Sequence, residues 1–169
     1  HDELLRSVGG FLAAQQQPDG KVFAEWDPDA GRAVPVTGPF ATGEAVWALT
    51  LLDAEFPGEG WGEAARPTLD YLALHRDREE GNFTRMPDHW AAYALAEAGP
   101  ASLDEARLGY ARQLAGYFGL RLRVEAQRRG TGINLAVRWY PGPPAGVGTA
   151  GEGIGALWRL AQEDPRLSD

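Results

Sequence analysis

Apolar residues recur at three- and four-residue spacing along most of the chain, which is the period of helices that bury one face. In the first such stretch the apolar positions are Leu4, Leu5, Val8, Phe11 and Leu12. The pattern breaks wherever proline and glycine gather, because these residues end helices. We therefore predict six helices, over residues 2–17, 42–55, 62–76, 88–98, 103–127 and 149–163.

Long loops separate some of these helices. Residues 21–40 contain Pro28, Pro35 and Pro39, which exclude a regular helix and predict an irregular, extended excursion. Residues 77–86 are charged and poor in hydrophobes, and residues 142–146 hold two prolines and two glycines. Both segments are therefore predicted to be loops.

The stretch from residue 120 to 140 supports two interpretations. Its apolar residues alternate in two runs separated by Arg129, Gly130 and Thr131, a pattern that favours a β-hairpin. A row at every fourth position instead favours a helix, and it consists of Leu114, Phe118, Leu122 and Ala126. We prefer a helix to about residue 127, followed by a loop with room for one short strand.

Every second predicted helix begins in a similar way. The segments 43–49, 88–95 and 151–157 each combine an acidic start with small residues and a strongly apolar body. The helices between them are more amphipathic, so fully buried inner helices should alternate with half-exposed outer ones. This pattern predicts an all-α fold, with residues 1–169 forming a single domain of about three helical hairpins connected by long loops.

Composition excludes several functions. The formal charge of −8, without a basic stripe, argues against nucleic-acid binding. No apolar run approaches the roughly 20 residues of a membrane span, so we expect a soluble chain that does not enter a membrane. The absence of cysteine excludes disulfides and thiolate zinc sites but leaves the compartment undetermined. The histidines, His1, His75 and His89, are too scattered for a metal site, and we expect neither a metal nor a cofactor.

A short motif near the N-terminus suggests a superfamily. Phe11-Leu12, Gln16 and Gly20 match the aromatic-Leu-x3-Gln-x3-Gly part of a terpenoid-cyclase repeat, although Val22 stands where that motif has tryptophan. Together with the rhythm of helix pairs, these residues resemble the α/α-toroid superfamily of six-hairpin glycosidases, terpenoid cyclases and protein prenyltransferases. The aspartate cluster DxDD of the cyclases is absent, and residues 27–30 are its nearest approach.

The resemblance implies half a toroid, because complete rings of this kind contain about six hairpins. Half a ring would leave an apolar edge open to solvent. We therefore expect a homodimer, a covering loop, or the remainder of a longer parent chain to cover that edge.

The resemblance also implies a functional rim where the inner helices begin. Glu44, Asp88 and Glu152 would stand there as general acid or base, assisted by His89. Aromatic faces pack on sugar rings, and paired carboxylates can cleave a glycosidic bond. The predicted function is a glycoside hydrolase or a related glycan-modifying enzyme. The predicted substrate-binding residues are Trp26, Phe40, Trp90, Tyr93, Trp139 and Tyr140.

The same residues also have structural explanations. An acid in the first turn of a helix is stabilised by the helix dipole by roughly 0.3–1 kcal/mol without any substrate. Trp47, Trp90 and Tyr93 stand at helical spacing, which is typical of core residues. The alternative functions are therefore a non-catalytic helical-repeat module that binds a glycan or protein, or a terpenoid-cyclase-like hydrophobic pocket, which the missing aspartates disfavour.

Overall fold

The computed structural model describes residues 1–80, 88–128 and 144–168, and within these ranges the chain is mainly helical. The predicted all-α class is confirmed. The helices are α1 (Asp2–Ala14), α2 (Ala41–Glu55), α3 (Trp61–Leu74), α4 (Arg76–Glu80), α5 (His89–Ala98), α6 (Glu105–Arg128) and α8 (Pro144–Glu163), with 3-10 turns η1 (Pro100–Ser102) and η2 (Pro165–Leu167). The short strands β1 (Glu25–Asp27) and β2 (Arg32–Val34) form an antiparallel pair.

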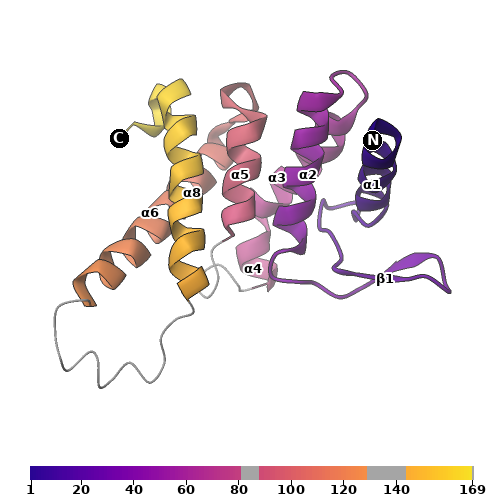
Figure 1. Ribbon diagram of the computed structural model, residues 1–169, viewed down its shortest axis with the longest axis horizontal. Helices are drawn as coiled ribbons and strands as arrows, with labels where there is room; N and C mark the ends of the chain where they lie inside the picture. The colour runs from indigo at the N-terminus through magenta and orange to yellow at the C-terminus, as the bar shows by residue number, and fades with distance from the viewer. Residues whose placement is uncertain (81–87, 129–143, 169) are drawn as a thin grey trace.

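Two layers of helices make up the fold (Figure 1). Helices α2, α5 and α8 lie side by side, with α5 packed between the other two, and all three begin at the same end of the layer. Helix α3 packs against α2, and α6 packs against α8, to form the second layer. Helix α1 packs beside α2 at one edge.

The core lies between the two layers. It includes Val46 and Leu49 from α2, Leu72 from α3, Leu95 from α5 and Phe118 from α6, all of them buried. Helices α6 and α8 approach closely at Gly153 of α8, because this residue has no side chain and lies directly against the Phe118 ring. The pattern of strongly apolar segments therefore identified the helices of one layer correctly, but the prediction that they are fully buried is wrong, since Leu51 of α2 and Trp158 of α8 are exposed. A toroidal arrangement stays a prediction.

The motif residues Gln16 and Gly20 fasten the end of α1 to α3. The Gln16 amide donates hydrogen bonds to the Ala64 carbonyl oxygen at 2.7 Å and to Thr68 Oγ1 at 2.6 Å. Gly20 has φ 90° and packs so closely on the Pro67 carbonyl that no side chain would fit. Gln16 and Gly20 therefore have a structural role: they hold the segment that follows α1 against α3 of the second layer.

Several predicted boundaries differ from the structure. Helix α1 ends at Ala14 instead of residue 17, because Gln16 leaves the helix to pair with Val22 in an isolated bridge. The loop predicted over residues 21–40 contains the β1–β2 pair. Helix α8 starts at Pro144, five residues early, since proline fits the first position of a helix.

The ambiguous stretch is settled only in part. Helix α6 continues to Arg128, as the preferred interpretation predicted. The segment in which a short strand was considered lies outside the described residues. Among the described helices, none has a long enough apolar stretch to cross a membrane.

Candidate functional site

Asp88 is fixed at the start of α5. Its Oδ1 accepts hydrogen bonds from the backbone N–H groups of Trp90 at 3.0 Å and Ala91 at 3.2 Å, so it is the N-cap of this helix. Its Oδ2 accepts a hydrogen bond from Arg76 Nη1 at 2.5 Å. Only 2% of the residue is exposed. Both carboxylate oxygens are therefore engaged by the protein itself.

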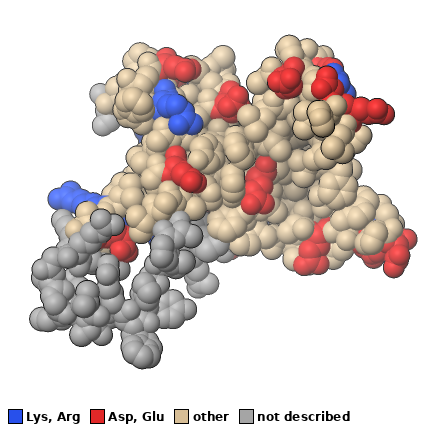
Figure 2. All heavy atoms as spheres, viewed as in Figure 1, with Lys and Arg blue, Asp and Glu red and all other residues tan. Residues whose placement is uncertain are grey.

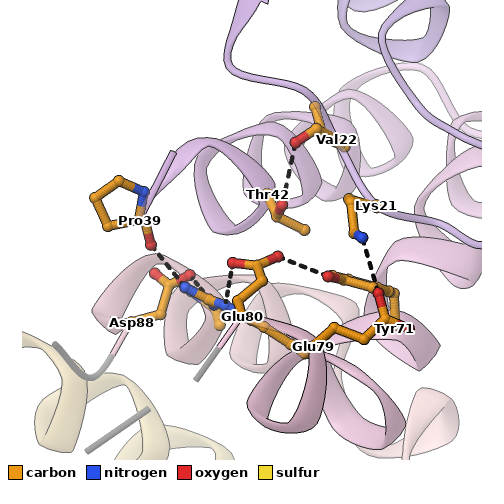
Figure 3. A network of polar contacts seen from close by, with 10 residues as sticks. Lys21, Val22, Pro39, Thr42, Tyr71, Glu79, Glu80 and Asp88 are labelled. Carbon is orange, nitrogen blue, oxygen red and sulfur yellow. Dashed lines mark hydrogen bonds and ion pairs between the residues drawn. The ribbon is translucent and has the colours of Figure 1, made fainter. Parts of the chain in front are cut away.

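Arg76 connects Asp88 to the surrounding segments, and Figure 3 shows its partners Pro39, Glu80 and Asp88 close to one another. Its Nη2 donates a hydrogen bond to the Pro39 carbonyl oxygen at 2.6 Å, and its Nε lies 3.7 Å from Glu80 Oε2. Glu80 in turn accepts a hydrogen bond from the Tyr71 hydroxyl at 2.7 Å. This buried network joins α3, α4 and α5 to the segment that leads into α2.

Burial and neighbouring charges act in opposite directions on the pKa values of Asp88 and Arg76. Burial raises the pKa of Asp88, and the adjacent Arg76 guanidinium and the helix amide groups limit that rise. Burial alone would lower the pKa of Arg76, but the Asp88 and Glu80 carboxylates raise it above its ordinary value. Burial also raises the pKa of the Tyr71 hydroxyl. Arg76 thus stays charged and needs its acidic partners.

The first turn of α2 lies against this network. A Cβ atom at Gly43 would collide with the Asp88 carboxylate, so only glycine allows the approach. The next residue, Glu44, is exposed. The starts of α2 and α5 are therefore in contact, with one acidic residue buried between them and another at the surface.

Three aromatic rings stack on the exposed side of α2 and α5. The Trp47 ring centroid lies 5.1 Å from that of Trp90 and 5.0 Å from that of Tyr93, with interplanar angles of 30° and 24°. The Trp90 and Tyr93 centroids are 5.9 Å apart, so both rings cover the same face of Trp47. Trp47 is partly exposed, and no described aromatic ring contacts its other face. We call these three rings the aromatic platform.

His89 and Glu152 lie beside the aromatic platform. The His89 ring is buried against Trp90, with 4.5 Å between centroids, and packs edge-on to Phe40 at 6.0 Å. His89 Nε2 lies 4.0 Å from Glu152 Oε2, while 54% of the Glu152 side chain is exposed. His89 Nδ1 makes no hydrogen bond with any described residue. Burial and the Glu152 carboxylate raise the pKa of Tyr93.

The structure brings most of the predicted site residues together. Asp88, His89, Phe40, Trp90 and Tyr93 are linked by the contacts above, and Glu152 joins them from α8. Glu152 lies in the interior of α8 and not in its first turn, because this helix begins earlier than predicted. The dipole explanation considered for Glu152 is therefore wrong.

Other predicted residues lie elsewhere. Trp26 belongs to β1 and packs on Phe11 of α1, with 5.2 Å between ring centroids. Trp139 and Tyr140 lie outside the described residues. The sequence interpretation treated Trp47 as core and did not single out Arg76. The position of Trp47, three residues after Glu44, was the available signal, since residues three apart share a helix face.

A separate groove of about 900 Å³ opens near the opposite ends of α2 and α5, between these helices and the starts of α3 and α6. Its lining includes Asp53, Asp70 and Glu97 together with Arg66 and Arg107. Asp70 accepts hydrogen bonds from Arg107 at 2.7 and 3.1 Å. None of the predicted site residues lines this groove. The described residues contain no cluster of three or more acidic, histidine or cysteine side chains able to hold a metal ion.

Fold and site together define an all-α protein of two packed helical layers, with an aromatic and acidic surface where the helices of one layer begin. The chain matches no protein-family model, no curated protein and no solved structure.

Proposed function

We propose that this chain is a carbohydrate-active helical domain that binds a glycan on the aromatic platform. Trp47 packs against the core but is partly exposed, and its exposed part offers an apolar surface for the C–H face of a sugar ring. Glu44 and Glu152 are exposed nearby and can accept hydrogen bonds from sugar hydroxyl groups. Ligand sites commonly combine aromatic walls with a few polar groups in this way.

One observation carries the proposal: Trp90 and Tyr93 stack on the same side of Trp47. Stacking fixes the indole orientation before a ligand arrives, so binding costs little side-chain entropy. A sugar that covers roughly 60–100 Å² of the ring would gain about 1.5–2.5 kcal/mol from apolar burial. This contribution corresponds to an affinity change of about tenfold or more.

Tryptophan fluorescence titration with neutral oligosaccharides tests the proposal. Tetramers of glucose in α and β linkage and of N-acetylglucosamine make a suitable panel. We expect saturable binding of at least one of them, weakened at least tenfold in Trp47→Ala. Trp158→Ala removes an exposed tryptophan outside the platform and should bind normally. Equal affinity of the Trp47 variant and the parent protein would contradict the platform's role.

Glycosidic hydrolysis is a second candidate, favoured by the 4.0 Å separation of His89 and Glu152. Hydrolysis requires one carboxyl group that protonates the leaving oxygen and a second group that activates water or attacks. Glu152 and Glu44 are accessible for these roles, whereas the Asp88 carboxylate is buried and already bonded. We therefore keep Glu44 and Glu152, which were already predicted as acid/base residues, and remove Asp88 from that role.

Product release separates the two candidates. A hydrolase should release reducing ends from the bound oligosaccharide, and Glu152→Gln should abolish this while retaining binding. A binding module should bind the oligosaccharide and leave it intact. A terpenoid-cyclase-like function would need a hydrophobic pocket. The groove near the ends of α2 and α5 is instead lined largely by charged and polar side chains, so it does not favour this alternative.

A further inference from the structure

Helix α1 presents an apolar stripe to solvent. Leu4, Val8 and Phe11 are between 43% and 65% exposed. The opposite side of the helix is the one that packs, since Gly9 lies against Leu52 of α2 and Trp61 of α3. At about 100° per residue, Leu4, Val8 and Phe11 lie about 100–160° around the helix from Gly9. Contiguous exposed apolar side chains of this kind mark interaction surfaces.

The other end of the array has an exposed apolar side chain as well. Trp158 of α8 is 63% exposed. Within the same helix Glu152 faces His89 of α5, and Gly153 faces Phe118 of α6. Trp158 lies about 120–140° around the helix from both, so it points away from the neighbours of α8. The two ends of the array thus each expose large apolar groups.

Charge differs between these two edges. The α1 edge carries the exposed acids Asp2 and Glu3 beside Arg6, and the neighbouring β1 strand starts with exposed Glu25. At the other edge acids are present too, since Glu152 and Glu163 of α8 are exposed, but the α6 sequence holds five arginines and two glutamates, with Arg112 and Arg123 exposed. On the face shown in Figure 2, the basic atoms lie mainly on the side of α6 and α8. Opposite charges favour contact between unlike edges and disfavour contact between two α1 edges.

We infer that the α1 edge of one copy packs against the α6–α8 edge of a second copy. This contact buries the apolar stripe of α1 against the region around Trp158, with the acids of one edge near the arginines of the other. It continues the side-by-side packing that α2, α5 and α8 have within the chain. Such unlike-edge contacts give a closed ring or a linear series of copies. The inference does not depend on glycan binding.

Sedimentation equilibrium across micromolar to millimolar protein tests this contact. The unaltered chain should self-associate, while Val8→Glu and Trp158→Glu should each weaken association at least tenfold. Both side chains are exposed, so the variants should keep their helical circular dichroism. Leu74→Glu replaces an exposed leucine at the end of α3, on neither α1 nor α8, and should associate as the unaltered chain does.

A mixing experiment identifies which edges meet. Val8→Glu retains an intact α6–α8 edge, and Trp158→Glu retains an intact α1 edge, so an equal mixture should form heterodimers that neither variant forms alone. A monomeric parent chain at every concentration would overturn the inference. Self-association that is sensitive to Val8→Glu but unaffected by Trp158→Glu would also overturn it, because this result indicates an α1–α1 contact.

Discussion

Replacing Asp88 by asparagine tests whether this residue holds the fold together. Asparagine keeps an oxygen that can accept the Trp90 and Ala91 amide hydrogen bonds, so the cap of α5 should survive. It removes the negative charge that Arg76 contacts at 2.5 Å. The substitution therefore isolates the contribution of the buried ion pair from that of the helix cap.

The cost of this substitution follows from the burial of Arg76. Removing one partner of a buried ion pair destabilises a protein by about 3–5 kcal/mol, because an uncompensated charge remains. The Glu80 carboxylate at 3.7 Å and the Pro39 carbonyl still face the guanidinium, which places the expected loss near 3 kcal/mol. Asp88→Ala also removes the cap and should lose about 1 kcal/mol more.

Urea unfolding followed by circular dichroism measures both losses in the free energy of unfolding. Arg76→Met with and without Asp88→Asn completes a double-mutant cycle that reports the coupling of the pair. A loss below about 1 kcal/mol in Asp88→Asn would refute the reasoning, since this is the range of exposed ion pairs. The same variant should leave glycan affinity unchanged, in contrast to Trp47→Ala.

Three further predictions concern single residues. Gly43→Ala should lower the free energy of unfolding by about 1–3 kcal/mol, because the new methyl group meets the Asp88 carboxylate. Gly116→Ala, whose Cβ would meet nothing within 4 Å, should instead raise it by about 0.5–1 kcal/mol in thermal or urea unfolding. Hydrogen bonding to Arg166 lowers the pKa of Asp164, so this pair contributes stability above about pH 4 that is lost as the pH falls. Urea unfolding at several pH values measures this loss of stability in acid, and the loss should be smaller in Asp164→Asn.

The helical layers could be predicted because their residues obey strong local rules. The apolar residues Ala45, Val46 and Leu49 of the segment 43–49 are buried in α2, and the helix predicted over residues 88–98 corresponds to α5, which Asp88 caps. The β1–β2 pair escaped prediction because each strand has only three residues, too few for an alternating pattern. Its turn depends on Asp27 accepting two backbone hydrogen bonds, from Asp29 and Ala30.

The sequence predicted where the candidate site lies, but not which of its acidic residues is exposed and which is buried. Asp88 and Glu152 were both read as acids on a rim, yet one is buried and the other exposed. The difference depends on Arg76, which comes from another helix and has no sequence signature. Trp47 was predicted to be a core residue, and it does pack against the core, but it is also partly exposed; helical spacing alone does not reveal which face of a buried helix reaches the surface.

A titration by heteronuclear NMR tests the central claim most directly, since each tryptophan indole N–H gives its own signal. Addition of the tightest-binding neutral oligosaccharide should shift the signals of Trp47 and Trp90 and leave that of Trp158 in place. Saturable shifts confined to tryptophans other than Trp47 and Trp90, or no shifts at saturating sugar, would contradict glycan binding on the aromatic platform.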